Sequence, residues 1–291
     1  MLVLLGYLIT TFSVFGGFAM AGGHLESLFQ PIELLMIGGA SVGSFLVSNN
    51  WKIIKNTLKN IYKTIMSFGY TRQYYVQLLS MLFEVADKIR KEGAISLESD
   101  LEQPKESALL SKYPLVCKDA EIMEFFTDYM QFILTGRVDT HNMEMLMEQD
   151  IETFTEEKEH YVHAINKMAD AMPAFGIVAA VMGVVHTMGS LGIPPEELGV
   201  LIARALVGTF LGVLIGYGFI APLGVLQEHK LNSSVKSLNC IRVVLIAMVN
   251  NYSPAMATEF GRKIIYGTDR MNSKELDELL KGIKQSNKGQ V

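Results

Sequence analysis

Two small groups of side chains in this sequence have residue types that could do chemistry. His186 and Ser190 are four residues apart and so share one face of a helix, as a serine–histidine hydrolase would need. His160 and His163 follow Glu159 and have the types that bind zinc. The first pair lacks a G-x-S-x-G motif and an acid to orient the histidine, and the second group lacks a compact fourth ligand. We therefore predict no catalytic residue, no metal site and no cofactor, and a protein that is not an enzyme.

Four stretches without charge determine which elements can position a functional residue. Residues 2–22, 34–51, 171–195 and 205–227 contain no Asp, Glu, Lys or Arg. A helix needs about 20 apolar residues to cross a bilayer core of about 30 Å. We predict an all-α polytopic membrane protein with four transmembrane helices in the lipid bilayer and a helical cytoplasmic domain. The net charge of −5 argues against nucleic acid as a partner.

The predicted division of the chain follows these stretches. Transmembrane helices 1 and 2 fall in 1–50, and transmembrane helices 3 and 4 fall in 171–227. The cytoplasmic helical domain is 51–170, and a cytoplasmic C-terminal tail follows at 228–291.

Basic residues close to the spans predict the orientation of the chain in the membrane. They are Lys52, Lys55, Lys59, Lys63, Lys167, Lys230 and Lys236. The two short connections, 23–33 and 192–203, contain no Lys or Arg, and Arg204 just beyond the second is the one exception. This bias places both termini and the long 51–170 segment in the cytoplasm, and the two short connections outside.

Helical periodicity and helix-ending residues organise the cytoplasmic segment. Apolar residues recur at helical spacing up to Gly93, and a second helix over about 119–135 is closed by Gly136. From Thr140 to Pro173 there is no other Gly or Pro, which predicts one long helix that rises into the third span. The polar end of the chain, 269–291, is expected to fray.

The predicted spans lack the groups that a proton relay normally uses. None of the four stretches contains a carboxylate or a lysine, and their titratable candidates are His186, Tyr7 and Tyr217. Proton paths through membranes normally depend on Asp, Glu or His. Either the chain is a passive scaffold, or a partner chain supplies the ionisable group.

Two prolines lie near the cytoplasmic ends of the third and fourth spans. Pro173 and Pro222 each remove a backbone donor and clash with the carbonyl four residues earlier. The freed carbonyls, on Ala169 and Gly218, need other partners. The result is either an ordinary kink or a hinge that couples a membrane event to the cytoplasmic helices.

Small and polar residues pattern the fourth span. Gly208, Gly212 and Gly216 repeat every four residues and predict a face without side chains that packs on another helix. Thr209 is the polar side chain in the middle of this span, and its hydroxyl either bonds its own i−4 carbonyl or faces a water-filled path.

A string in the fourth span resembles the signature of the MotA family of flagellar motor stator proteins, which is distantly related to TolQ and ExbB. The string is Ala205-Leu206-x-Gly208-Thr209-Phe210-x-Gly212-x-Leu214, and Pro222 follows after seven residues. Four spans with a large loop between the second and third agree with this family. The resemblance implies a multi-pass protein of the bacterial inner membrane.

The resemblance also implies partners and residue roles. Such chains form a homo-oligomeric ring, expected to be pentameric, around two MotB-like chains. Each MotB-like chain binds peptidoglycan and has one span with an ion-binding aspartate. Thr209 would line the ion path beside this aspartate. Pro173 and Pro222 match the family's coupling prolines. Arg90 and Glu98 match its charged residues that face the rotor protein FliG.

The transported ion and the alternative functions follow from the same resemblance. Sodium-driven relatives have a threonine where this chain has Ala180, so the resemblance implies H+ as the transported ion. A TolQ/ExbB-like energiser of an outer-membrane process is an alternative, although that group typically has three spans. A passive membrane scaffold is a second alternative.

Overall fold

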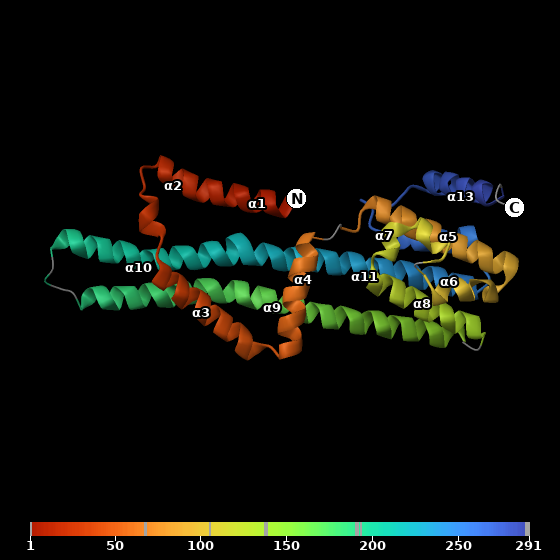
Figure 1. Ribbon diagram of the computed structural model, residues 1–291, viewed down its shortest axis with the longest axis horizontal. Helices are drawn as coiled ribbons and strands as arrows, with labels where there is room; N and C mark the ends of the chain where they lie inside the picture. Colours follow the sequence, from red (N-terminus) through yellow and green to blue (C-terminus); the bar gives the residue numbers. More distant parts are fainter. Residues whose placement is uncertain are drawn as a thin grey trace. The chain divides into compact units, whose positions relative to one another are not determined.

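The structure is a computed structural model that describes residues 2–66, 69–104, 106–136, 139–189, 192 and 194–288. Every element assigned within these residues is a helix, which confirms the predicted all-α class (Figure 1). The elements are α1 (Leu2–Thr11), η1 (Phe12–Gly16), α2 (Gly17–Met20), η2 (Leu25–Leu28), α3 (Pro31–Ser48), α4 (Trp51–Met66), α5 (Arg72–Glu92), η3 (Ala94–Leu97), α6 (Glu98–Glu102), η4 (Leu110–Lys112), α7 (Pro114–Cys117), α8 (Ala120–Thr135), α9 (Thr140–Met188), α10 (Pro195–Ile215), η5 (Gly216–Ile220), α11 (Ala221–Val249), α12 (Pro254–Ile264) and α13 (Ser273–Lys288).

Four helical segments of the described chain are long and apolar enough to cross a membrane. They are Leu2–Met20, Leu25–Ser48, Thr140–Met188 and Pro195–Val249, and each contains most of one predicted span. The second segment starts earlier than predicted, because α3 begins at Pro31 and therefore includes Glu33. The expectation that the spans contain no carboxylate is thus wrong for this helix.

The chain divides into two compact units whose boundaries differ from those of the four predicted segments. Unit 1 comprises Met1–Ser67 and Glu157–His229, and unit 2 comprises Phe68–Glu156 and Lys230–Val291. These boundaries reflect packing, so α4 and the start of the third span belong with the spans. The predicted boundaries at 50, 170 and 227 concern where the chain meets the bilayer surface and stay predictions.

Unit 1 is built around α10 and the second part of α9, which lie side by side in Figure 1. Its small buried core joins α3 to both helices through Ile37, Met172, Ala179, Val207 and Leu211. Large apolar side chains remain exposed on every span, and none of the apolar window of Leu2–Met20 is buried. Such surfaces need lipid or other protein chains to cover them.

Unit 2 has an extensive apolar core that resembles that of a soluble helical domain. Leu78 and Phe83 of α5 and Phe126 of α8 are completely buried there. Local chemistry sets the helix ends as predicted, because Gly93 (φ 86°) ends α5 and Gly136 (φ 64°) ends α8. The Asp119 carboxylate caps the start of α8 by accepting from the Ile122 N–H.

The polar C-terminal segment differs from the expectation that it frays. Residues Ser273–Lys288 form α13, which buries Leu276 and Leu280 in the core of unit 2. Their four-residue spacing gives the helix one apolar stripe, so tertiary packing compensates for its polar composition.

Candidate functional site

The α9–α10 pair packs backbone against backbone through glycine. A β-carbon added to Gly212 would lie 2.6 Å from the Met172 carbonyl oxygen and 2.9 Å from Gly176 Cα. A β-carbon on Gly208 would lie 3.2 Å from Ala179 Cβ. No side chain fits into this interface without moving the helices apart. The glycines predicted to form a bare face therefore contact α9 of the same chain.

Pro173 contributes to the same interface. The helix α9 continues through Pro173, so the proline lies inside the helix rather than at its end. The Ala169 carbonyl oxygen, which loses its usual donor at Pro173, lies 2.6 Å from the point where a β-carbon on Gly216 would stand. The freed carbonyl is therefore covered by the glycine face of the neighbouring helix.

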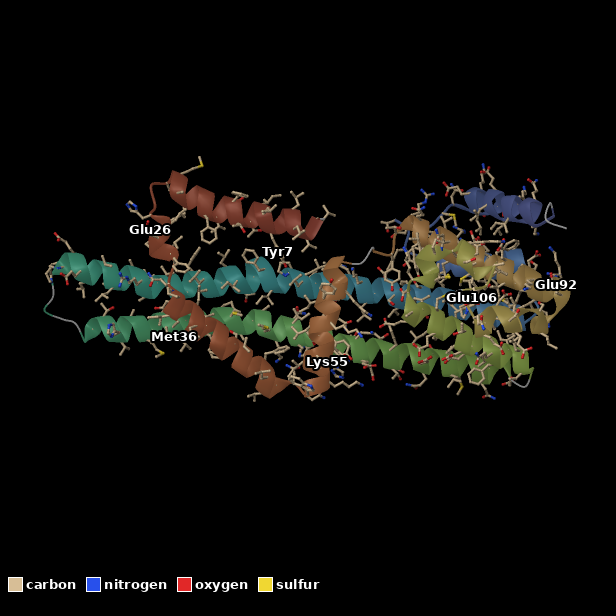
Figure 2. The ribbon with its side chains drawn as sticks, in the orientation of Figure 1. Tyr7, Glu26, Met36, Lys55, Glu92 and Glu106 are labelled. Atoms are coloured by element: carbon tan, nitrogen blue, oxygen red, sulfur yellow. The ribbon has the colours of Figure 1, made fainter. Side chains whose placement is uncertain are left out.

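Pro222 follows a turn of π-helix. The segment η5, Gly216–Ile220, is π-helical, and Pro222 is the second residue of the helix that comes next. A π turn widens the helix and leaves backbone groups available, and such turns are frequent at functional sites. Here the Tyr7 hydroxyl of α1 donates to the Phe219 carbonyl at 2.7 Å, and the two rings lie 5.2 Å apart. The region before Pro222 is thus fastened to the first span (Figure 2).

Thr209 and Ala180 lie on the α9–α10 pair at the same level. A β-carbon added to Gly176 would lie 3.4 Å from the Cα of Thr209. A β-carbon added to Gly208 would lie 3.4 Å from the backbone nitrogen of Ala180. Both residues are half-buried. Thr187 bonds its own i−4 carbonyl, whereas no hydrogen bond joins the Thr209 hydroxyl to another described residue. The Thr209 hydroxyl is therefore available to water or to a partner group.

Glu33 is a candidate that the sequence reasoning missed. Its Oε2 atom is buried without a hydrogen-bond partner in the described structure. The same atom lies 3.4 Å from the point where a β-carbon on Gly208 would stand. An unpartnered buried carboxylate oxygen is costly and often marks function. The sequence signal that could have revealed it is Pro31, because proline is favoured at the first position of a helix. A helix that starts at Pro31 has Glu33 in its first turn.

Arg90 and Glu98 lie in unit 2, near the end of α5 and at the start of α6. Both side chains are exposed, and neither forms an ion pair with another described residue. Two neighbouring lysines form ion pairs instead. Lys88 pairs with Asp100 at 2.6 Å, and Lys91 pairs with Asp87 at 2.6 Å. The two predicted rotor-facing charges thus remain available to a partner, whereas Lys88 and Lys91 are already paired within unit 2.

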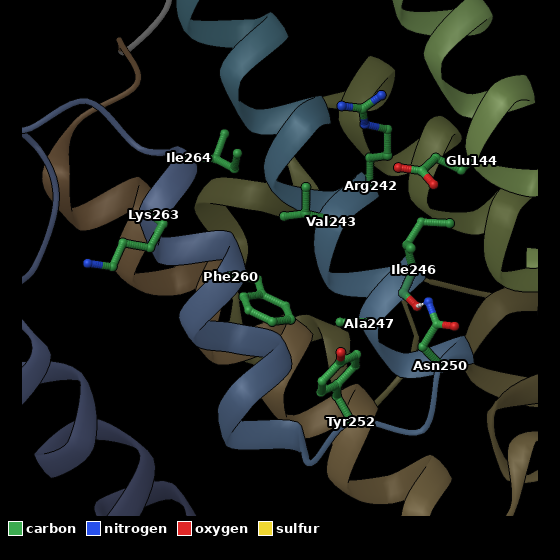
Figure 3. A pocket seen from close by; sticks show the side chains of 10 residues that line it. All are labelled: Glu144, Arg242, Val243, Ile246, Ala247, Asn250, Tyr252, Phe260, Lys263 and Ile264. Atoms are coloured by element: carbon green, nitrogen blue, oxygen red, sulfur yellow. Dashed lines mark hydrogen bonds between the residues drawn. The ribbon is translucent and has the colours of Figure 1, made fainter. Parts of the chain in front are cut away.

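A cavity of about 330 Å³ in unit 2 contains none of the predicted site residues. Figure 3 shows its lining from α9, α11 and α12, which includes Glu144, Arg242 and Lys263 among mainly apolar side chains. Asn250 bonds the Ile246 carbonyl at 3.0 Å within it. Ser190, the other half of the serine–histidine pair, lies outside the described residues.

Comparisons with known proteins identify the family. Residues 4–93 match the family described as Motility protein A N-terminal, and residues 118–239 match the MotA/TolQ/ExbB proton channel family. Motility protein A of Salmonella typhimurium is 44% identical over 291 residues, with 100% of this chain and 99% of the relative covered. The chain belongs to the motility protein A family. Motility protein A of Escherichia coli, at 45% identity over 98% of this chain and 96% of its own length, agrees.

Two solved structures share the fold of this chain. The structure of C. jejuni MotAB has a TM-score of 0.79, with 19% identity over 93% of this chain and 98% of that chain. The flagellar MotAB stator complex from Bacillus subtilis has a TM-score of 0.73, with 18% identity over 88% of this chain and 92% of that chain. Family membership makes the chain a flagellar stator subunit of the proton channel family. The N-terminal match, which is specific to motility protein A, disfavours the energiser alternative.

Proposed function

We propose that this stator subunit conducts H+ together with a MotB-like partner whose single span supplies the ion-binding aspartate. The observation that carries the proposal is the α9–α10 pair, which presents the free Thr209 hydroxyl and Ala180 at one level. Beside it, Ile177, Val181 and Val185 form an exposed apolar row at four-residue spacing on α9. A partner helix that covers this row would bring its aspartate close to Thr209.

The same level of the helix pair supports H+ rather than Na+ as the transported ion. Sodium needs several oxygen ligands, and Ala180 offers none from its side chain. Glu33 adds a carboxylate of the chain's own beside Gly208. A carboxylate that lacks hydrogen-bond donors is suited to hold a proton, so we include Glu33 in the proposed path.

Conformational coupling is proposed for the two proline sites. Protonation of the partner's aspartate would change its attraction to the α9–α10 pair. The π turn before Pro222 and the interrupted hydrogen bonding at Pro173 are the places where these helices can bend. Arg90 and Glu98 would then transmit the motion to FliG by complementary charge, which steers and registers a partner.

The assembly and the location complete the proposal. We expect a homopentameric ring around two MotB-like, peptidoglycan-binding chains. The exposed apolar surfaces of all four spans support burial in lipid and against other chains. The ring would lie in the bacterial inner membrane, with both termini in the cytoplasm.

Proton flux measured in cells tests the proposal. The chain is co-expressed with a MotB-like partner from which the plug, the segment that would close the resting channel, has been deleted. Cytoplasmic pH is then followed after external acidification. We expect acidification that does not depend on Na+ and that disappears when the partner's aspartate is replaced by asparagine. Acidification that is absent with the intact partner aspartate would favour the passive scaffold, and dependence on Na+ would contradict the assignment of the ion.

A further inference from the structure

The helix α4 turns away from the direction of the spans directly after α3. Only Asn49 and Asn50 separate the two helices, and Asn49 has extended backbone (φ −130°, ψ 145°). Asn50 Oδ1 then accepts from the Ile53 N–H at 2.9 Å and starts the new helix. Figure 1 shows α4 running across the direction of α9 and α10 in unit 1. A helix placed in this way beside the end of a span can lie along the bilayer surface.

One face of α4 is fixed to the rest of unit 1. Ile54 is 8% exposed and Thr57 is 1% exposed, so both face the protein. The Asn56 side-chain amide donates to the Tyr161 hydroxyl of α9 at 3.0 Å. These contacts determine which side chains of α4 remain uncovered.

The uncovered face consists of two adjacent ridges. At 100° per residue, the first ridge is apolar and aromatic, and the second is basic. The apolar ridge is formed by Trp51 (76% exposed), Leu58 (61%), Tyr62 (67%) and Ile65 (36%). The basic ridge is formed by Lys52, Lys55, Lys59 and Lys63, of which Figure 2 labels Lys55. Lys52, at the start of this ridge, also pairs with Glu157 of α9 at 3.4 Å, so the lysines that follow it carry the proposal. The helix carries no acid, although the whole chain has a net charge of −5.

We propose that this face of α4 lies in the headgroup region of the leaflet where α3 ends and binds anionic phospholipids there. The apolar ridge would reach the acyl boundary, and the lysines would contact lipid phosphates. Aromatic side chains beside lysines are typical anchors at this depth. The face also continues an apolar surface of the preceding span, on which Val47 is 90% exposed. This continuity favours lipid over an acidic protein as the occupant.

Trp51 provides the experiment, because it is the chain's single tryptophan. The full-length chain is reconstituted in mixed phosphatidylcholine and phosphatidylglycerol vesicles, with bromine on the acyl chains of one lipid or the other at equal total bromine. We expect brominated phosphatidylglycerol to quench Trp51 fluorescence roughly twofold more strongly than brominated phosphatidylcholine. The preference should shrink as salt is added. Equal quenching by the two lipids, or none by either, would overturn the proposal.

Variants of the lysines on α4 separate the effect of their charge from the position of the helix in the bilayer. Lys55→Gln/Lys59→Gln should abolish the preference while bromine on phosphatidylcholine still quenches Trp51, which shows that the helix remains in the bilayer. Lys55→Arg/Lys59→Arg should retain the preference. The matched control is Lys274→Gln/Lys281→Gln, which removes two exposed lysines from α13 of unit 2 and should behave like the wild type. Loss of the preference in this control would show that net charge, rather than α4, selects the lipid, and would refute the site.

Discussion

The Cδ atom of Pro173 lies 2.8 Å from the point where a β-carbon on Gly216 would stand. The residue that interrupts the hydrogen bonding of α9 is therefore packed directly on the glycine face of the next span. That face continues into the π turn before Pro222. The two prolines are thus linked through one interface made of backbone, and a side chain introduced there should disturb both.

Gly216→Ala should abolish or strongly reduce swimming. The added methyl group would clash with the Ala169 carbonyl and with Pro173, and overpacking of this kind costs about 1–3 kcal/mol. Swimming speed and the amount of the chain in the membrane are measured together. Gly199→Ala, at a position of α10 with open space around its β-carbon, is the control and should swim normally. Normal swimming of Gly216→Ala would argue against a tight interface.

Tyr7→Phe should loosen the first span from the π turn. The variant keeps the ring contact with Phe219 but leaves the Phe219 carbonyl without its donor, at a cost of about 1–3 kcal/mol. We expect a lower thermal unfolding midpoint of the detergent-solubilised chain and reduced motor torque. Tyr217→Phe removes an exposed hydroxyl from the same turn and should change neither quantity. Equal effects of the two changes would show that the Tyr7 bond is unimportant.

Glu33→Gln should slow proton flux several-fold without changing the abundance of the stator. Glutamine keeps the size of the side chain but holds no exchangeable carboxyl proton beside Gly208. The plug-deleted acidification assay gives the rate. Glu26→Gln, which changes an exposed acid in the connection before α3, is the matched control. If the two variants conduct equally, Glu33 does not belong to the path.

Reversal of the charge of Arg90 or Glu98 should impair rotation rather than conduction. In Arg90→Glu and in Glu98→Lys, an exposed side chain without an ion pair would repel a rotor surface that it now attracts. Swimming should fall in each variant, while proton flux stays at the wild-type level. A compensating charge reversal on FliG should restore swimming. Normal swimming of the doubly reversed chain would refute their contact with the rotor.

Glu259 should make the stability of unit 2 depend on acid pH. Hydrogen bonds from Arg262, both at 2.6 Å, and its positive charge lower the pKa of Glu259. Because the folded pKa lies below the unfolded value of about 4.3, this stabilisation is complete above that pH and is lost as pH falls through the folded pKa. Thermal unfolding midpoints of the wild type and Glu259→Gln should differ at neutral pH and converge in acid. Glu278→Gln, which changes an exposed acid on α13, should follow the wild type throughout.

Local chemistry made much of the fold predictable. Gly93 and Gly136 end their helices because positive φ angles are easy only for glycine, and the run from Thr140 to Pro173 is helical because little interrupts it. The tail was misjudged because its polar composition hid the stripe of Leu276 and Leu280. That stripe becomes decisive only when a core is available to cover it.

The site was less predictable because tertiary contacts form it. The absence of charge marked the spans, and this criterion excluded Glu33 from the predicted second span, although its Oε2 atom lies beside Gly208 of another helix. Similarly, the hydroxyl that satisfies the Phe219 carbonyl belongs to Tyr7, at the other end of the spans in the sequence. No local pattern indicates such a partner. The roles of the two prolines and of Thr209 remain predictions.

The glycine interface also limits where the stator can yield. Where two helices meet through backbone atoms, few side chains can repack, so the helices resist sliding by small steps. The α9–α10 pair should therefore move together as one rigid body. On the proposed mechanism, the work delivered by the ion would then appear as bending where this tight contact ends, at the π turn on one helix and at Pro173 on the other. The glycines would thus serve as the rigid part of the machine and the prolines as its joints.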